Sequence, residues 1–67
     1  MEKFADRLKG VRLEKGLTLE ELAKEVNIST SSLSRWELSQ ADIKGYYLVI
    51  LAKYFNVTTD YLLGIED

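Results

Sequence analysis

Apolar residues recur along most of this chain at the three- and four-residue spacing of amphipathic helices. The first such stretch predicts a helix over residues 2–15, which Gly16 ends. The side of this helix that faces the core is expected to carry Phe4, Ala5, Leu8 and Val11. Its basic residues are expected to be solvated: Lys3, Arg7 and Lys9.

Residues 17–38 predict two short helices separated by a tight turn. Thr18 is placed to cap the first of them, and Glu21 follows three residues later, which is the spacing of a capping box. The inward face of this helix is Leu19, Leu22, Ala23 and Val26. Asn27 ends it, and Ser29 caps the next helix.

The helix after Ser29 has two different faces. Leu33 and Trp36 point inward, so Trp36 is expected in the core rather than in a stacking role. The outward positions form one stripe, which consists of Thr30, Ser31, Ser34, Arg35 and Leu38. Arginine can donate two hydrogen bonds to guanine, and threonine and serine hydroxyls can bond bases or phosphates. The stripe therefore has the chemical groups needed to touch base edges in a DNA groove.

The remaining residues predict two more helices. One runs from about residue 44 to 56, with an inward face of Leu48, Leu51, Ala52 and Phe55. Thr58 caps a last short helix, residues 59–63, which ends at Gly64. The prediction is an all-α fold in which residues 1–67 form a single domain without repeats or linkers.

Composition limits what can hold such a small domain together. The chain has 67 residues, and none of them is cysteine or histidine, so disulfides and the usual zinc sites are excluded. Hydrophobic residues make up 46% of the chain, which is sufficient for a small helical core. No apolar run approaches the roughly 20 residues of a membrane span, and the N-terminus lacks a signal-peptide pattern. We expect a soluble cytoplasmic protein.

The net charge of −2 argues at first against nucleic-acid binding, because phosphate neutralisation supplies much of that affinity. The acid excess lies in the C-terminal part, however. Residues 1–40 hold seven basic and seven acidic side chains, whereas residues 41–67 hold two basic and four acidic ones. Any DNA affinity is therefore expected to be modest and sensitive to salt.

Four short runs resemble the helix-turn-helix of the phage repressor and Cro family, also called the xenobiotic-response-element family: Gly16-Leu17-Thr18, Leu22-Ala23, Val26-Asn27-Ile28-Ser29 and Leu33-Ser34-Arg35-Trp36-Glu37. Residues 51–64 are similar to the last two helices of many members from Gram-positive bacteria. The resemblance covers nearly the whole chain. It implies a compact five-helix lambda-repressor-like bundle, with the second and third helices as the helix-turn-helix, in a protein encoded by a bacterium or phage.

The resemblance also implies roles for individual residues. Thr30, Ser31 and Arg35 match base-reading positions, and the same stripe adds Ser34. The phosphate contacts expected are Arg12, the backbone amides of Leu19 and Glu20, Ser29, Gln40 and Lys44. Arg12 and Glu37 match a family ion pair, which either only orients the helices or also contacts phosphate.

The chain departs from the family pattern at several positions. Leu19 stands where many relatives have a glutamine that supports a phosphate contact, and Glu20 and Glu21 beside it would repel DNA. Ser39 replaces a glycine, so it must take a left-handed conformation or the loop must differ. Ile43 replaces a proline, and Asp42 replaces a basic residue near the DNA backbone. These changes again predict modest affinity.

The fourth helix carries apolar residues where relatives have polar ones. Tyr46, Ile50 and Tyr54 recur every four residues, which either marks a partner surface or places the tyrosines flat across neighbouring helices. By family analogy, the region from Val57 to Leu63, including Tyr61, lies near the twofold axis of a DNA-bound dimer. These six residues are the candidate dimer or partner surface.

The leading hypothesis is a sequence-specific regulator, most simply a repressor, that binds a pseudo-palindromic operator in double-stranded DNA as a homodimer. The alternative is a protein-interaction module, antitoxin-like or coactivator-like, with the same fold. An enzyme is not expected, because the sequence offers no histidine, cysteine, phosphate-binding glycine loop or paired carboxylates in a cleft. No cofactor, metal, membrane or small-molecule ligand is expected either.

Overall fold

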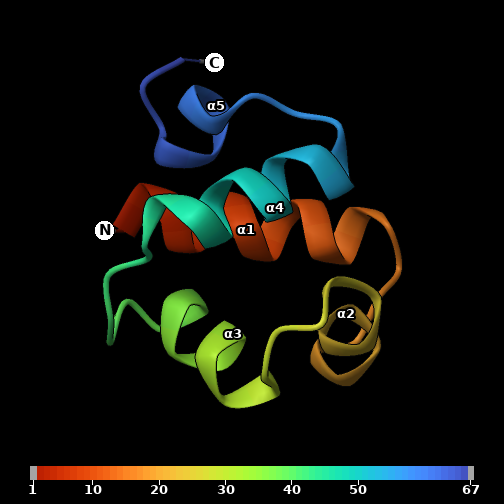
Figure 1. The fold of residues 1–67 in the computed structure, drawn as a ribbon. Coiled ribbons are helices and arrows are strands. Elements are labelled where there is room, and N and C mark those ends of the chain that lie inside the picture. Colours follow the sequence, from red (N-terminus) through yellow and green to blue (C-terminus); the bar gives the residue numbers. More distant parts are fainter. Residues whose placement is uncertain (1, 67) are drawn as a thin grey trace.

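The computed structural model describes residues 2–66, and this part of the chain folds into five α-helices (Figure 1). They are α1 (Glu2–Glu14), α2 (Leu19–Val26), α3 (Thr30–Glu37), α4 (Gly45–Phe55) and α5 (Thr59–Leu63). The all-α five-helix prediction is confirmed. The first helix ends at Glu14, one residue earlier than predicted, and α4 is one residue shorter at each end than the predicted range of 44–56.

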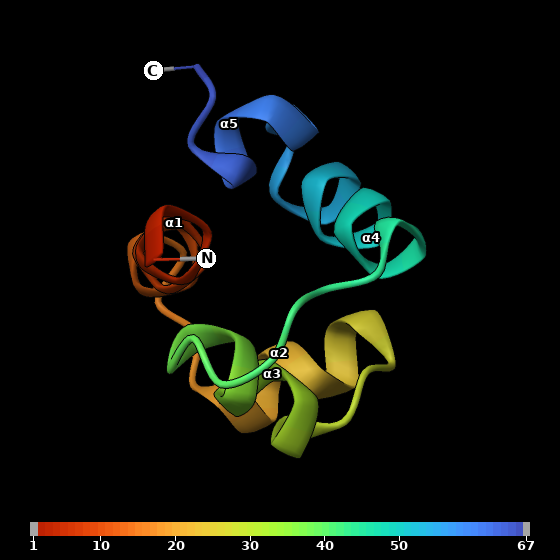
Figure 2. The same ribbon diagram turned by 90° about the vertical axis from the view of Figure 1, so that its left-hand side faces the viewer.

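The helices enclose the core from four sides. When the molecule is turned by 90°, α1 and α4 lie opposite each other, with α2 and α3 across one end and α5 across the other (Figure 2). The body measures 27 × 23 × 20 Å. The helix-turn-helix therefore occupies one end of the molecule, away from α5.

The core takes side chains from every helix. Its fully buried large members are Phe4, Leu8, Leu22, Leu33, Leu51 and Leu62. Trp36 is 6% exposed, which confirms it as a core residue. Val11 and Phe55 are only partly buried, and in the last turn of α1 the buried residue is Arg12. Within residues 2–66, no helix is both long and apolar enough to cross a bilayer.

Arg7 corrects one expectation. Its Nη1 donates to the backbone oxygens of Tyr61 at 3.1 Å and Glu66 at 2.9 Å. Its guanidinium also lies 4.2 Å from the centre of the Tyr61 ring, in cation–π geometry. Arg7 is therefore not a solvated surface residue, because it ties α1 to the C-terminal segment. The sequence pattern missed this role because the acceptors are backbone carbonyls more than fifty residues away.

Polar side chains fix where three of the helices begin. The Thr18 hydroxyl accepts from the Glu21 amide at 3.1 Å, and the Glu21 carboxylate accepts from the Thr18 amide at 2.9 Å, which completes the predicted capping box. The bond from the Thr18 amide lowers the pKa of Glu21 below its ordinary value. The hydroxyls of Ser29 and Thr58 cap α3 and α5 by accepting from the amides of Ser32 and Tyr61. Lys44, which precedes α4, provides no side-chain cap.

Every helix of the described chain ends through the same backbone device. A residue with positive φ follows the helix, and the amide after it bonds the carbonyl five residues back, as in the Schellman motif. The left-handed residues are Gly16, Asn27, Ser39, Asn56 and Gly64. The corresponding bonds measure 2.8 to 3.3 Å. These closures keep the connections short and set the direction in which each following segment leaves.

Ser39 is the unusual member of this set. Its φ is 57°, so the left-handed conformation expected where relatives have glycine is present. The Gln40 amide bonds the Arg35 carbonyl at 2.8 Å, and the Ser39 amide bonds the Trp36 carbonyl at 3.2 Å. Glycine adopts this conformation freely and asparagine tolerates it, whereas serine does so at a cost. The end of α3 thus has the same closing hydrogen bonds as the other helices, but the backbone of Ser39 is strained.

Candidate nucleic-acid interface

The turn between α2 and α3 is short and tightly held. Asn27 ends α2 with φ 56°, and Ile28 then enters the core at 7% exposure. Ser29 starts α3 by accepting a bond from the Ser32 amide at 3.1 Å. Because Leu33 and Trp36 are buried behind it, α3 has one fixed orientation on the body. Its outer face therefore points in a defined direction.

That outer face carries the stripe found in the sequence. Ser31, Arg35 and Leu38 are exposed, and Thr30 and Ser34 are half-buried. Hydroxyl groups of this kind can donate or accept hydrogen bonds, and the guanidinium adds several donors. All five positions therefore stand on one accessible surface, as the helical spacing predicts. Base contact by Thr30, Ser31, Ser34 and Arg35 stays a prediction.

Arg35 is the most informative member of the stripe. Among residues 2–66, its side chain has no hydrogen-bond or ion-pair partner. A planar guanidinium with unused donors matches the two acceptors on the major-groove edge of guanine. The alternative for an exposed arginine is a surface salt bridge, and Arg35 makes none within the described chain.

Arg12 and Glu37 form the expected ion pair between α1 and α3. Arg12 Nε lies 2.7 Å from Glu37 Oε2, and Arg12 Nη2 lies 2.9 Å from Oε1, so the contact is bidentate. Arg12 Nη1 also donates to the Leu17 carbonyl at 2.8 Å. The two side chains are only 10% and 6% exposed. Arg12 thus connects α3, through Glu37, to α1 and to Leu17, which lies two residues before α2.

The pair also limits what Arg12 can do for DNA. Hydrogen bonding to Glu37 raises the pKa of Arg12 further above its ordinary high value, so its charge is permanent. Three of its five N–H groups bond within the protein. The structure therefore supports the orienting role directly. A phosphate contact would use the remaining N–H groups, and that contact stays a prediction.

Lys9 is a candidate that the sequence pattern missed. It lines a shallow hollow between α1, α2 and α3 together with Arg12, Leu19, Ser34, Glu37 and Leu38. Lys9 is exposed, so its ammonium is available at the rim beside the recognition helix. The signal was present in the spacing, because Lys9 stands three residues before Arg12 and so lies on the same face of α1.

The other expected phosphate contacts differ in availability. The N-terminus of α2 places the amides of Leu19 and Glu20 at its first turn, with Leu19 half-buried and Glu20 exposed. Gln40 and Lys44 are exposed. Ser29 is less available, because its hydroxyl accepts from the Ser32 amide and donates to Ser32 Oγ at 2.9 Å. A phosphate would have to displace that second bond.

The stripe Tyr46, Ile50 and Tyr54 does not form one open face. Tyr46 is 73% exposed, with Tyr47 edge-on beside it, whereas Ile50 packs against the core. The Tyr54 hydroxyl donates to Glu25 at 3.1 Å, and the Lys15 ammonium lies 5.0 Å from the centre of the Tyr54 ring. Burial raises the pKa of Tyr54, and the Glu25 contact adds to this effect. Tyr54 thus lies against a neighbouring helix, which is the second of the two alternatives. Tyr46 is exposed, and its use as a partner surface stays a prediction.

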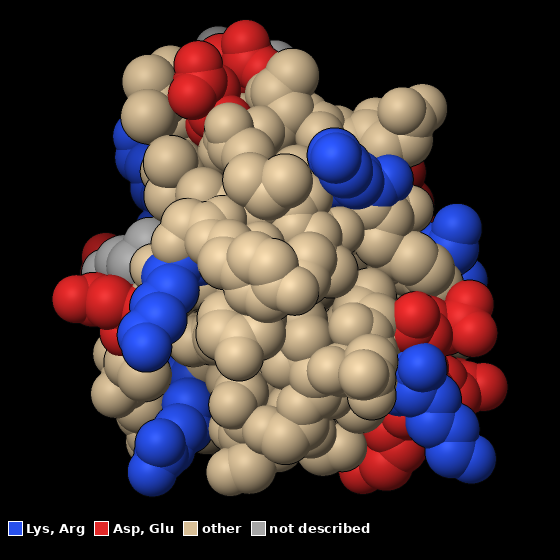
Figure 3. Space-filling model, in the orientation of Figure 1, with Lys and Arg blue, Asp and Glu red and all other residues tan. Residues whose placement is uncertain are grey.

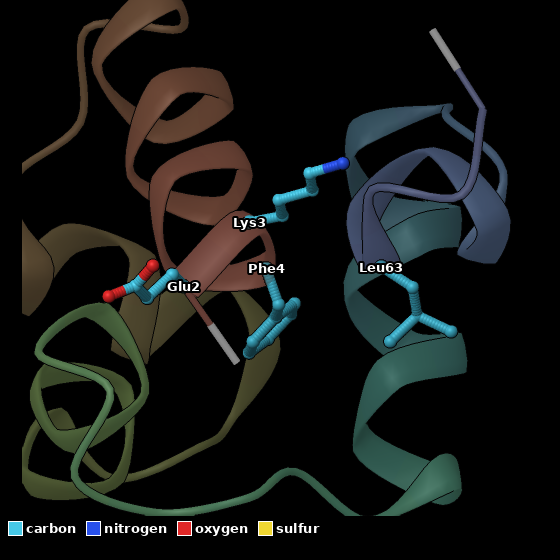
Figure 4. Close-up of a pocket in the computed structure, with 4 residues that line it drawn as sticks. All are labelled: Glu2, Lys3, Phe4 and Leu63. Atoms are coloured by element: carbon cyan, nitrogen blue, oxygen red, sulfur yellow. The ribbon is translucent and has the colours of Figure 1, made fainter.

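The candidate residues near α5 are also separated. Val57 lines a hollow with Val11, Glu14, Lys15 and Phe55 at the end of α1. Leu63 lines another hollow, between the start of α1 and the end of α5, where it lies across from Phe4 (Figure 4). Tyr61 lies under the Arg7 guanidinium. All three are partly buried within one chain, and a dimer role for them stays a prediction.

Charge is unevenly spread over the surface. In the face shown in Figure 3, charged side chains stand around the margin, and the middle carries none. In this orientation α4 lies in front of α1, so the uncharged middle overlies α4. The exposed apolar side chains of α4 are Tyr46 and, at 43%, Val49. The molecule thus has a polar stripe on α3 and a mainly apolar surface over α4, on which Lys53 is the exposed charge within the helix.

Comparisons with known proteins agree with this geometry. The sequence profile of the Cro/C1-type helix-turn-helix family matches residues 8–62. The restriction-modification controller protein C.AhdI from Aeromonas hydrophila has a similar structure, with a TM-score of 0.83 at 28% identity over 91% of this chain and 92% of that protein.

Three bacterial regulators are similar in sequence. The HTH-type transcriptional regulator ImmR of Bacillus subtilis is 39% identical over 91% of this chain. The uncharacterized HTH-type transcriptional regulator YobD of the same species is 36% identical, and the HTH-type transcriptional activator BcrR of Enterococcus faecalis is 34% identical, each over 96% of this chain. The matches span 48%, 57% and 31% of those proteins, so the chain corresponds to only part of their length. With the family profile matching most of its residues, this chain belongs to the Cro/C1-type helix-turn-helix family.

Proposed function

We propose that this domain is a sequence-specific regulator of transcription that binds double-stranded DNA through α3. The observation that carries the proposal is the outer stripe of α3, in which short hydroxyls surround an exposed arginine without an intramolecular side-chain partner in the described chain. Membership of the helix-turn-helix family supports it, as does the similarity to proteins named as transcriptional regulators.

In this proposal α3 lies in the major groove and reads bases directly. Arg35 donates two hydrogen bonds to a guanine, and Thr30 bonds a base or packs its methyl group on a thymine. Ser31 and Ser34 bond bases or phosphates with less discrimination. The Arg12–Glu37 clamp holds α3 in its orientation, so it contributes to recognition even without touching DNA.

Phosphate contacts position the domain on the duplex. The candidates with exposed polar groups are Lys9, Gln40 and Lys44, and the amides at the start of α2 add two uncharged donors. The remaining N–H groups of Arg12 and the hydroxyl of Ser29 complete the set. Because Glu20 and Glu21 lie beside the α2 amides, the affinity is modest and falls steeply with salt.

A homodimer on a pseudo-palindromic operator follows from the same proposal. The recognition helices of two copies would then lie about 34 Å apart, one turn of DNA. The dimer surface draws on Tyr46, Ile50 and Tyr54 of α4 and on Val57, Tyr61 and Leu63 near α5. The simplest action is repression by occupying a promoter in the bacterial or phage cytoplasm. Since one relative is named an activator, activation is the opposite outcome that a reporter assay would detect.

The test is selection of bound sequences from a random duplex pool at low and at near-physiological salt. Wild type is compared with Arg35→Ala and with Lys53→Ala, which removes an exposed charge from α4. We expect an enriched inverted repeat, and Arg35→Ala should relax the choice at one base of each half-site and cost about 1–3 kcal/mol of binding free energy. Lys53→Ala should keep the base preference. No enrichment at either salt would reject the proposal.

A second candidate function rests on the surface over α4. Tyr46 and Val49 are exposed apolar side chains one turn apart on α4, which is typical of a protein-binding surface. A protein-interaction module, antitoxin-like or coactivator-like, would use this surface and show no salt-dependent affinity for duplex DNA. The same selection experiment therefore separates the two functions.

A further inference from the structure

Leu38 is the one apolar member of the outer stripe of α3. It is 62% exposed, whereas the other leucine and the tryptophan of the same helix are buried in the core. Exposed leucines are common on protein surfaces, and exposure alone says little. The place of Leu38 relative to the reading residues is what makes it informative.

Leu38 stands almost directly in line with Ser31. The two are seven residues apart, which leaves them only about 20° apart around the helix axis and about 10 Å apart along it. A helix that turns Ser31 toward the base edges therefore turns Leu38 the same way, about 10 Å further along, which is the length of about three base-pair steps. Arg35 lies between them on the same surface.

The backbone holds Leu38 firmly in this position. Its amide bonds the Ser34 carbonyl at 3.0 Å, and the two bonds that close the end of α3 follow it immediately. Leu38 therefore remains at the end of the helix rather than in a mobile loop. Beside it, Leu19 and Ser34 line the same shallow hollow, so the surroundings of Leu38 include a second apolar side chain.

We infer that Leu38 is a specificity-determining residue that packs against the 5-methyl group of a thymine in the major groove. This inference rests on the proposed DNA-reading function. A leucine cannot bond a phosphate or a polar base edge, and the thymine methyl is the apolar feature that base edges present in the major groove. A thymine at that step would bury the exposed leucine, whereas the other bases would leave it against polar groups.

The test removes only the methyl group from the DNA. In the operator obtained by selection, each thymine is replaced in turn by deoxyuridine, which keeps the base pair and its O4 acceptor. Wild type should lose about three- to fivefold in affinity at one thymine of each half-site, as expected for one buried methyl group at about 0.8 kcal/mol. Leu38→Ala should bind the thymine and uracil duplexes equally at that position.

Leu13→Ala is the matched control, because Leu13 is a leucine of similar exposure, 57%, on α1. It should keep the full penalty for uracil. Circular dichroism and thermal unfolding establish that both variants are folded.

Three results would overturn the inference. The first is an operator in which no thymine-to-uracil change weakens wild type. The second is a penalty for uracil that persists in Leu38→Ala, whether or not that variant binds all duplexes more weakly. The third is a loss of the penalty in the Leu13→Ala control as well. In each case the enriched operator still supports DNA reading by α3, so the inference fails alone. If no duplex is enriched at all, the proposed function fails with it.

Discussion

Helices α3 and α4 are both fixed to the core by large apolar side chains, yet their outer faces differ completely. The outer face of α3 carries three hydroxyls and an arginine, with Leu38 at its end. The outer face of α4 carries the exposed apolar side chains Tyr46 and Val49, with Lys53 one turn further on. The inward residues of both helices are apolar for the same reason, because they are buried in the core. The outward residues differ, and on that basis we propose nucleic acid as the partner of α3 and an apolar partner for α4.

The anchoring of the two helices differs as well. Helix α3 is clamped to α1 by the buried Arg12–Glu37 pair, whereas α4 is tied to α2 by the bond between Tyr54 and Glu25 in a more exposed place. A buried pair is costly to break, because the surviving charge is left without a partner. The orientation of α3 thus depends on a buried charge pair in addition to packing, whereas that of α4 depends mainly on packing.

The largest expected effect comes from breaking the clamp on α3. Glu37→Ala leaves the Arg12 guanidinium buried and without its carboxylate, so it should lower the free energy of unfolding by about 3 kcal/mol. Urea denaturation followed by circular dichroism measures this change. Glu20→Ala, at an exposed acid of α2, should change the free energy of unfolding by less than about 0.5 kcal/mol.

A double variant separates the charge effect from packing. Arg12→Met with Glu37→Leu replaces the pair by apolar groups and should recover most of the lost stability. If Glu37→Ala were as stable as wild type, the pair would not hold α3. If the double variant were as unstable as the single one, packing rather than stranded charge would explain the loss.

The next effect tests the outer face of α4. Replacing Tyr46 and Val49 together by serine should weaken self-association at least about tenfold, or about 1.4 kcal/mol, because it removes Tyr46 from the proposed dimer surface and the exposed Val49 beside it. Analytical ultracentrifugation measures the dissociation constant. The stability of the single chain should be nearly unchanged, since both side chains are exposed. An unchanged dissociation constant would show that Tyr46 is not part of the dimer surface, and Val57, Tyr61 and Leu63 would remain as its candidates.

The smallest effect concerns the ends of the two helices. Ser39 ends α3 and Asn56 ends α4, both in the left-handed conformation. Ser39→Gly should raise the free energy of unfolding by about 1 kcal/mol, because serine pays for this conformation more than glycine does. Asn56→Gly should gain less, since asparagine visits this region readily. Thermal unfolding of both variants measures the difference, and equal gains would show that Ser39 is not strained.

Much of the fold could be predicted from the sequence because its signals are local. Caps such as Thr18 and Ser29, stop residues such as Asn27 and Gly64, and the apolar spacing of Leu33 and Trp36 each act within one helix. Family resemblance added the pairing of Arg12 with Glu37 across a distance that no local pattern spans. The tie from Arg7 to the Tyr61 and Glu66 carbonyls was missed because backbone acceptors leave no mark in a sequence.

The candidate site could be predicted only in part. Helical spacing placed the stripe of α3 correctly on one surface, but the same reasoning grouped Tyr46, Ile50 and Tyr54 as one face. A four-residue spacing puts side chains near one another on a helix, and how α2 packs beside them decides which are covered. Tyr54 reaches Glu25 of α2, and Tyr46 has no such neighbour on its outer side. The exposure of a side chain on α4 therefore depends on how the neighbouring helices pack against it, which the spacing within α4 does not encode.

The five backbone closures at the helix ends have a kinetic consequence. Each helix is stopped by atoms within six residues of its own end, so its length is set before the helices meet. Chains whose structure is largely encoded by nearby residues lose little entropy in reaching the folding transition state and fold fast. This domain should therefore refold within milliseconds or less, which would allow a newly made chain to reach its working shape almost as soon as it is released.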